Sequence, residues 1–171
     1  GCTEALAASI IGLCDTGDEV VVLEPSYDSY SAVIAMAGAV PKYVTLRPPH
    51  YDLDLDALRT AITPKTKVLL INTPHNPTGK VLTREEMQGI ANLAIENDLI
   101  VVSDEVYEHL VFDGVKHVCM AEIPGMRERT LVLSSGGKTF NTTGWKVGWV
   151  CAPPEQRAEA DINIEFAITS K

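Results

Sequence analysis

Four short apolar runs in the sequence are each followed directly by side chains that could do chemistry. These are Tyr27 after the first run, Asn76 after the second, Asp104 with Tyr107 after the third, and Lys138 after the fourth. A lysine that has lost its proton is a nucleophile toward carbonyl carbon, and a carboxylate stabilises a neighbouring cation. If the runs are parallel strands of one sheet, all of these side chains reach the same edge, where open α/β sheets bind their ligands. The sequence therefore predicts a small-molecule site.

Each of these residues also has a purely structural interpretation. Asn76 precedes Pro77 and Gly79, and all three residue types favour turns. Asp104 could cap a helix that follows its strand, and Tyr27 could be an aromatic residue at a helix start that packs on the sheet. A lysine taken singly is most often a solvated surface residue. Coincidence of all four at one edge is improbable, which favours the functional interpretation of the set.

A competing motif overlaps the lysine. Gly137-Lys138-Thr139 after an apolar run matches the end of a phosphate-binding P-loop, which would indicate a nucleotide triphosphatase. That motif requires another glycine five residues before Gly137, so that backbone amides can wrap the phosphates. The position holds Val132, inside an apolar run. The P-loop interpretation is therefore disfavoured.

The elements that must position these residues alternate between apolar runs and helical patterns. Such alternation predicts an α/β fold, with a mostly parallel sheet and helices on both faces. Most of the runs are apolar throughout, as strands buried on both faces should be. We predict strands at Glu19 to Leu23, Val40 to Thr45, Lys67 to Ile71, Leu99 to Ser103, Thr130 to Leu133 and Val147 to Cys151.

Helices are predicted between the strands from apolar residues at helical spacing. Thr83 and Glu86 form a capping box ahead of the clearest helix, and a further helix is predicted to begin after Pro153. The buried faces are predicted to be Leu6, Ile10 and Leu13; Tyr30, Ile34 and Ala37; Leu55, Leu58 and Ile62; and Met87, Ile90, Ala94 and Ile95.

Composition excludes several classes of partner. The net charge of -9 and the pI near 4.8 predict repulsion from nucleic acid and from an anionic membrane surface. No run approaches the roughly 18 apolar residues that a membrane span needs. Four scattered cysteines in a chain of 171 residues suit no zinc site and are typical of reduced thiols, which favours a cytoplasmic protein. The length predicts a single domain.

Five ordered motifs resemble those of the class I/II aminotransferases of pyridoxal-phosphate fold type I. They are GCTEAL, EPSYDSY, NTPHNPTGK, SDEVYEHLVF and SSGGKTFNTTGWKVGW. The resemblance covers the chain from Gly1 to about Pro154 and is closest to the kynurenine, glutamine and methionine aminotransferase branch. It implies a cofactor, pyridoxal 5′-phosphate, and a fold that corresponds to the large domain of such enzymes.

The resemblance also implies roles for individual residues around the cofactor ring. Lys138 would carry the cofactor as a Schiff base and move a proton at the substrate's α-carbon. Asp104 would face the pyridine nitrogen and keep it protonated through a charge-assisted hydrogen bond. Tyr107 and Asn76 would contact the 3′-oxygen, and Tyr27 would stack on the ring.

The phosphate of the cofactor is expected at the start of the first helix. There the backbone amides of Cys2 and Thr3 would meet it at the positive end of the helix dipole. Ser135 and Lys146 would complete the phosphate site. Many relatives have arginine where this chain has Lys146, and lysine there is typical of the kynurenine-type branch.

The resemblance implies transamination between an α-amino acid, of kynurenine, glutamine, methionine or aromatic type, and a 2-oxo acid. The sequence leaves two alternatives open: β-elimination with the same cofactor, and a cofactor-binding piece without turnover. Residues 1–171 are expected to be part of the large domain. An amino-terminal segment, a carboxyl-terminal small domain carrying an arginine for the substrate carboxylate, and a partner subunit of a homodimer would complete the enzyme.

Overall fold

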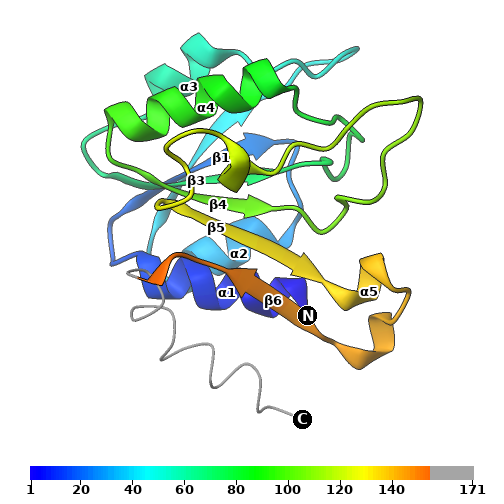
Figure 1. The fold of residues 1–171 in the computed structure, drawn as a ribbon. Coiled ribbons are helices and arrows are strands. Elements are labelled where there is room, and N and C mark those ends of the chain that lie inside the picture. Colours follow the sequence, from blue (N-terminus) through cyan, green and yellow to red (C-terminus); the bar gives the residue numbers. More distant parts are fainter. Residues whose placement is uncertain (155–171) are drawn as a thin grey trace.

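A computed structural model of the chain describes residues 1–154 (Figure 1). The helices and strands alternate along most of the chain, as the sequence pattern predicts. In chain order they are α1 (Cys2–Leu13), β1 (Glu19–Glu24), α2 (Ser29–Met36), β2 (Val40–Thr45), α3 (Leu55–Ala61), β3 (Thr66–Asn72), α4 (Arg84–Glu96), β4 (Ile100–Asp104), η1 (Met120–Glu122), β5 (Thr130–Ser135), α5 (Gly136–Thr139), η2 (Thr143–Trp145) and β6 (Gly148–Cys151).

The strands form one six-stranded sheet in the order β2-β1-β3-β4-β5-β6 (Figure 1). The first four pairings in this order are parallel, and β6 joins β5 in the antiparallel direction. The carboxyl ends of β3, β4 and β5 therefore lie side by side, because Asn72 pairs with Asp104 and Asp104 with Leu133. This is the edge where the sequence places its candidate site residues, and the predicted fold class is confirmed.

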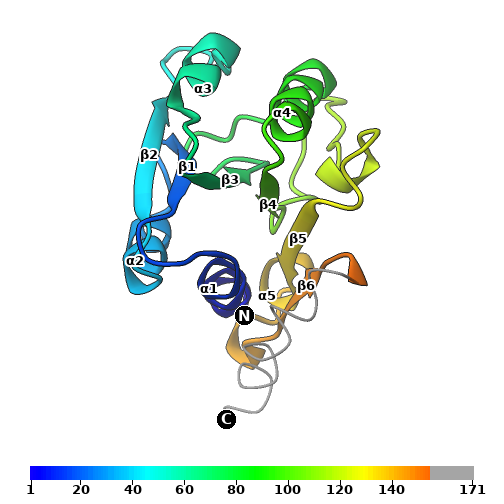
Figure 2. The same ribbon diagram turned by 90° about the vertical axis from the view of Figure 1, so that its left-hand side faces the viewer.

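Successive residues of the central strands point to opposite faces of the sheet, so the sheet carries two cores. On one face Val21, Leu69 and Val101 pack with the side chains of α3 and α4. On the other face the strand residues pack with α1 and α2, through contacts that include Leu6 and Ile34. Figure 2 shows the two helix pairs on opposite sides of the sheet.

Strand β2 differs from the prediction that most strands are buried on both faces. It lies at the edge of the sheet, and Val44 is its only buried residue. Pro41 fits this position because an edge strand can leave one side of its backbone without ladder hydrogen bonds. The other predicted strands differ from the observed ones only by one or two residues at their ends.

The helices follow the predicted faces with two exceptions. The capping box is confirmed, since Thr83 and Glu86 exchange both bonds at the start of α4. Ile95 is 44% exposed and Leu55 is also exposed, so these two assignments are wrong. Ala37 and Ile62 lie just beyond the ends of α2 and α3, but both are partly buried and pack against the core as predicted. The helix predicted after Pro153 lies outside the described residues. Among the residues described, no helix is long and apolar enough to cross a membrane.

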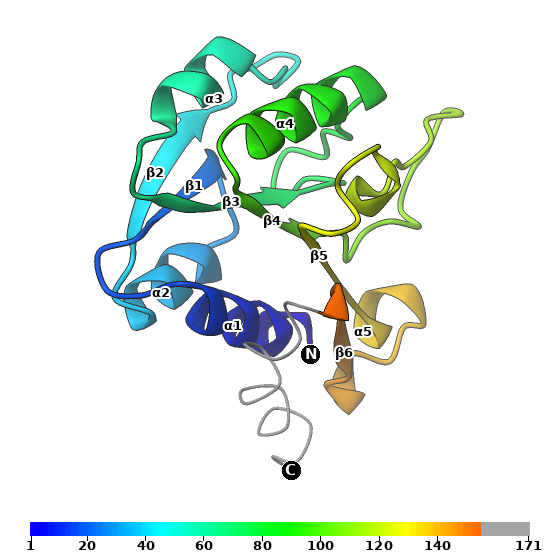
Figure 3. The same ribbon diagram turned by 60° about the vertical axis from the view of Figure 1, so that its left-hand side comes forward.

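The amino-terminal end of α1 lies against β6, at the far side of the sheet from β2 (Figure 3). A glycine makes this contact possible. A Cβ atom on Gly148 would lie 2.5 Å from the carbonyl carbon of Gly1 and 2.7 Å from the nitrogen of Cys2. The backbones of the helix start and the strand could not approach this closely with any larger residue, so Gly148 helps to place the start of α1.

We predict that Met87→Ala lowers the free energy of unfolding by about 2–5 kcal/mol, because Met87 is fully buried in the core under α4. Met36→Ala is the matched control, since Met36 is 71% exposed on α2 and should change the value by no more than about 0.5 kcal/mol. Equilibrium urea denaturation measures both. Equal effects of the two substitutions would contradict the placement of the core.

Candidate active site

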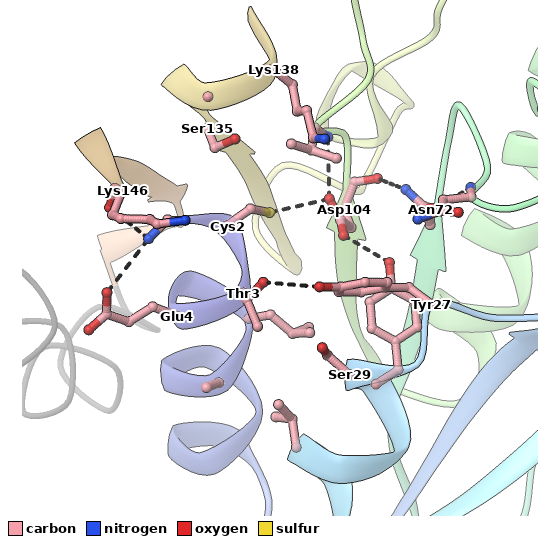
Figure 4. Close-up of a pocket in the computed structure, with 18 of the residues that line it drawn as sticks. Cys2, Thr3, Glu4, Tyr27, Ser29, Asn72, Asp104, Ser135, Lys138 and Lys146 are labelled. Atoms are coloured by element: carbon pink, nitrogen blue, oxygen red, sulfur yellow. Dashed lines mark hydrogen bonds and ion pairs between the residues drawn. The ribbon is translucent and has the colours of Figure 1, made fainter. Parts of the chain in front are cut away.

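One cavity of about 910 Å³ opens at the carboxyl ends of the strands, in the size range of small-molecule sites (Figure 4). Residues from α1, α2, β3, the turn after β4, and the segment from β5 to β6 line it. The structure brings all of the sequence-predicted site residues to this cavity. They are Cys2, Thr3, Tyr27, Asn76, Asp104, Tyr107, Ser135, Lys138 and Lys146.

Asp104 ends β4 and is only 6% exposed. Its carboxylate accepts three hydrogen bonds, two of them from side chains that lie far away in the sequence. The hydroxyl of Tyr30 donates to Oδ2 at 2.8 Å, the thiol of Cys2 donates to Oδ1 at 3.4 Å, and the amide of Val106 donates to Oδ1 at 3.3 Å. A charged acceptor makes such bonds stronger than those between neutral groups.

Two opposing effects act on this carboxyl group. Burial raises the pKa of Asp104, whereas the bonds from Tyr30, Val106 and Cys2 oppose that rise and the nearby charge of Glu105 adds to it. The net shift is upward. The interpretation of Asp104 as a cap is partly right, because its Oδ1 accepts from the amide of Val106 in the turn that follows β4, although no helix begins there. The side chain also faces the cavity (Figure 4).

Tyr30 is a member of the site that the sequence analysis missed. Its apolar spacing in α2 predicted a core residue, and the ring is indeed buried at 2% exposure. Its hydroxyl nevertheless reaches Asp104, and burial together with that carboxylate raises the pKa of Tyr30 well above its ordinary value. The signal in the sequence was a hydroxyl on an otherwise apolar helix face, since a buried tyrosine hydroxyl needs a polar partner.

Tyr27 lies two residues before α2 begins and lines the cavity. Its ring meets that of Tyr30 edge to face, with centroids 5.6 Å apart and an interplanar angle of 89°. Its hydroxyl lies 3.5 Å from the Thr3 hydroxyl on α1. The structural interpretation of Tyr27 is therefore partly right, because the ring packs against a buried neighbour while it also faces the cavity.

Asn72 is the second residue that the sequence analysis did not assign to the site. The side chain is buried at the end of β3, where its Nδ2 donates to the backbone oxygen of Asp104 at 2.8 Å. Its Oδ1 accepts from the backbone amide of Asn76 at 2.7 Å. Asn72 thus ties the loop that carries Asn76 to the strand that carries Asp104.

Lys138 and Tyr107 approach the cavity from neighbouring strand ends. Lys138 lies in the single turn of α5 that follows β5, and Tyr107 lies in the turn after β4. The Nζ atom of Lys138 is 5.6 Å from the centroid of the Tyr107 ring, within range of a cation–π interaction. An amine, a phenol and the Asp104 carboxylate consequently border the same space.

The start of α1 forms part of the cavity wall, and helix starts attract anions. Among the described residues, the amides of Cys2 and Thr3 have no acceptor within the helix, and no side chain at the N-cap position accepts from them. The backbone nitrogen of Gly1 donates to the backbone oxygen of Lys146 at 2.7 Å, which holds the turn around Lys146 beside the helix start. Ser135, buried at the end of β5, also lines the cavity.

Comparison with known proteins identifies the family. The family model "Aminotransferase class I and II" matches residues 1–170. This chain belongs to the class I and II aminotransferases. A probable N-succinyldiaminopimelate aminotransferase of Mycobacterium tuberculosis is 54% identical over 157 residues, which is 91% of this chain and 40% of that protein. Kynurenine–oxoglutarate transaminase 1 of Rattus norvegicus is 45% identical over 164 residues, 90% of this chain and 39% of that protein.

The solved structure of N-succinyldiaminopimelate aminotransferase from Mycobacterium tuberculosis matches this fold with a TM-score of 0.95 at 51% identity. The match covers 98% of this chain and 44% of that one, so this chain spans less than half the length of the relatives that it matches. The predicted resemblance to the family is confirmed, and the fold is that of the large domain of these enzymes.

Class I and II aminotransferases depend on pyridoxal phosphate, and the cavity suits the chemistry of that group. The cofactor carries a ring nitrogen that can be cationic and a phosphate that is anionic. The cavity offers a buried carboxylate that retains an accepting lone pair, and a helix start where, among the described residues, the amides of Cys2 and Thr3 have no partner within the helix. Lys138 adds the amine that such enzymes need.

We predict that Asn72→Ala lowers the free energy of unfolding by about 1–3 kcal/mol. The change leaves the amide of Asn76 without its acceptor and removes one of the two bonds to the backbone oxygen of Asp104, whose other donor is the amide of Thr73. The control is Asn92→Ala on the exposed face of α4, where the only bond of the side chain is to Gln88, and the change should stay within about 0.5 kcal/mol. Urea denaturation measures both variants. An unchanged free energy of unfolding in Asn72→Ala would contradict the proposed role of Asn72 in joining the Asn76 loop to β4.

Proposed function

We propose that the full-length protein transfers an amino group between an α-amino acid and a 2-oxo acid with pyridoxal phosphate held by Lys138. The single observation that carries the proposal is that Lys138, the buried Asp104 and the start of α1 border one cavity. When bound, pyridoxal phosphate supplies an aldehyde that joins to amines and a ring that withdraws electrons from the substrate's α-carbon. The named relatives are aminotransferases, which supports transfer over elimination.

Residues of this chain would contact the cofactor ring in three ways. Lys138 supplies the amine at Nζ that bonds to the cofactor and, once released, carries a proton to and from the substrate's α-carbon. Asp104 holds a proton on the ring nitrogen, because its buried carboxylate stabilises the cationic form. Asn76 and Tyr107 donate hydrogen bonds to the 3′-oxygen, and Tyr27 covers one face of the ring.

The phosphate end relies mainly on backbone groups. The free amides of Cys2 and Thr3 and the helix dipole of α1 attract the anion. Ser135 donates a hydroxyl hydrogen bond, and Lys146 adds a point charge without the two-pronged geometry of arginine. Because these groups come from the first helix, from β5 and from the turn before β6, phosphate binding would hold three separate segments together.

The remaining parts of the proposal concern the whole protein. Residues 1–171 form part of the cofactor-binding domain, and the full-length protein is a cytoplasmic homodimer. The substrate is tested directly: purified full-length protein is supplied with 2-oxoglutarate and either kynurenine or N-succinyldiaminopimelate, which are the compounds in the names of the relatives. Glutamate formation with one of them identifies the amino donor, and formation with neither would count against both substrate classes.

Borohydride reduction of the full-length protein loaded with pyridoxal phosphate should leave a pyridoxyl group on Lys138, located by peptide mapping. Lys138→Ala should carry no such label, whereas Lys146→Ala should still be labelled at Lys138, because Lys146 contacts the phosphate and not the aldehyde. A pyridoxyl group on any other lysine of the parent protein would contradict the assignment of Lys138.

Lys146→Ala should raise the dissociation constant for pyridoxal phosphate about tenfold, because a charge-assisted contact to the phosphate is lost. Lys116→Ala is the control, since Lys116 is exposed and lies outside the cavity, and its dissociation constant should equal that of the parent. Equilibrium titration of cofactor-free protein measures both constants. An unchanged constant in Lys146→Ala would contradict the phosphate role.

A further inference from the structure

The Asp104 carboxylate receives two side-chain donors that the proposed reaction does not itself require. Tyr30 comes from α2 and Cys2 from α1, and both donate to Asp104. Figure 4 shows Cys2 and Asp104 facing each other. A carboxylate has about four accepting lone-pair positions. Tyr30 occupies one at Oδ2, while Cys2 and the amide of Val106 share Oδ1, so among the described residues one position at Oδ2 remains for a donor in the cavity.

We propose that Tyr30 and Cys2 are positioning residues that hold the Asp104 carboxylate ionised and oriented so that its remaining lone pair meets the ring nitrogen of the cofactor. This inference rests on the proposed function. It assigns Tyr30 a role beyond core packing, and it assigns the Cys2 side chain a role separate from that of its backbone amide.

The surroundings of Asp104 explain why such donors are needed. Burial favours the protonated acid, and the charge of Glu105 acts in the same direction. Glu105 is itself fully buried and is held by Ser103, His117 and the amide of Met120, so its side chain is not free to turn away. The bonds from Tyr30, Val106 and Cys2 are the effects that favour the carboxylate in the cofactor-free protein.

The two donors differ in strength and in what else they do. The Tyr30 bond is short and comes from a hydroxyl, whereas the Cys2 bond is 3.4 Å long and comes from a weak thiol donor. The Tyr30 ring also packs edge to face on Tyr27, which is proposed to cover the cofactor ring. Tyr30 therefore contacts both Asp104 and Tyr27, the two residues that would touch the cofactor ring from different sides. The substitution Tyr30→Phe removes only the hydroxyl and keeps the aromatic ring.

The main test is the pH dependence of pyridoxal phosphate binding to full-length protein. Binding should weaken as the pH falls and Asp104 takes up a proton. Loss of the Tyr30 bond raises the pKa of Asp104, so in Tyr30→Phe the acid midpoint of binding should move upward, by about one pH unit. Cys2→Ala should move it in the same direction by less. Tyr43→Phe, an exposed tyrosine on β2, is the matched control and should leave the midpoint unchanged.

A midpoint in Tyr30→Phe equal to that of Tyr43→Phe would overturn the role of Tyr30, even if borohydride labels Lys138 as proposed. If the parent protein carries no label at Lys138, the proposed function fails instead. The two failures are thus distinguishable.

A second measurement tests the contact of Cys2 with Asp104 without cofactor or turnover. Burial and the Asp104 carboxylate both raise the pKa of the Cys2 thiol, which slows its alkylation. In cofactor-free Asp104→Asn protein, iodoacetamide at alkaline pH should alkylate Cys2 at least about threefold faster than in the parent protein. Cys14 is an internal control, because it is buried at the other end of α1 and its raised pKa of about 12 does not depend on Asp104.

Mass spectrometry follows the two cysteines in the same sample. Faster alkylation of Cys2 with an unchanged rate at Cys14 supports the contact. Equal rates at Cys2 in the parent and in Asp104→Asn would overturn it, and so would a parallel increase at both cysteines, which reports a general loosening of α1.

Discussion

The burial of one carboxylate is the constraint on which the rest of the site depends. Asp104 lies at the end of a central strand, where little water reaches it, and a charge in such a place must be held by hydrogen bonds or be lost to protonation. Tyr30, Cys2 and Val106 provide those bonds from three different segments. A carboxylate held in this way can stabilise a cationic ring nitrogen more strongly than a solvated one, because less water competes for it.

The order of the strands explains how distant parts of the chain supply one site. Strands β3, β4 and β5 are neighbours, so Asn76, Asp104 and Lys138 arrive at one edge although about 30 residues separate each from the next. The antiparallel strand β6 then returns the chain past the start of α1, with Gly148 allowing the close approach. The amine and carboxylate groups of the cavity thereby border the same space as the start of α1.

Membership of the class I and II aminotransferases accounts for the general plan, and the comparisons extend over nearly the whole chain. The family fold nevertheless permits different side chains at some positions of the cavity. Lys146 stands where many relatives are expected to have arginine, and it offers charge without bidentate geometry. Cys2 places a thiol beside the key carboxylate, where its pKa is raised and its reactivity is correspondingly low.

The sequence by itself determined the alternation of strands and helices, the capping box of α4, and the residues that follow each strand, because these depend on local periodicity and on side-chain types at fixed spacing. Because parallel strands end at a common edge, it also placed Tyr27, Asn76, Asp104, Tyr107 and Lys138 together, and the family resemblance added Cys2, Thr3, Ser135 and Lys146; all nine are among the residues that line the cavity. Only the tertiary structure decided that Tyr30 reaches Asp104, that Asn72 ties the loop of Asn76 to the end of β4, and that β2 is an edge strand. These facts depend on strand order and on which helix crosses which strand, and such long-range packing leaves no periodic signal in the chain.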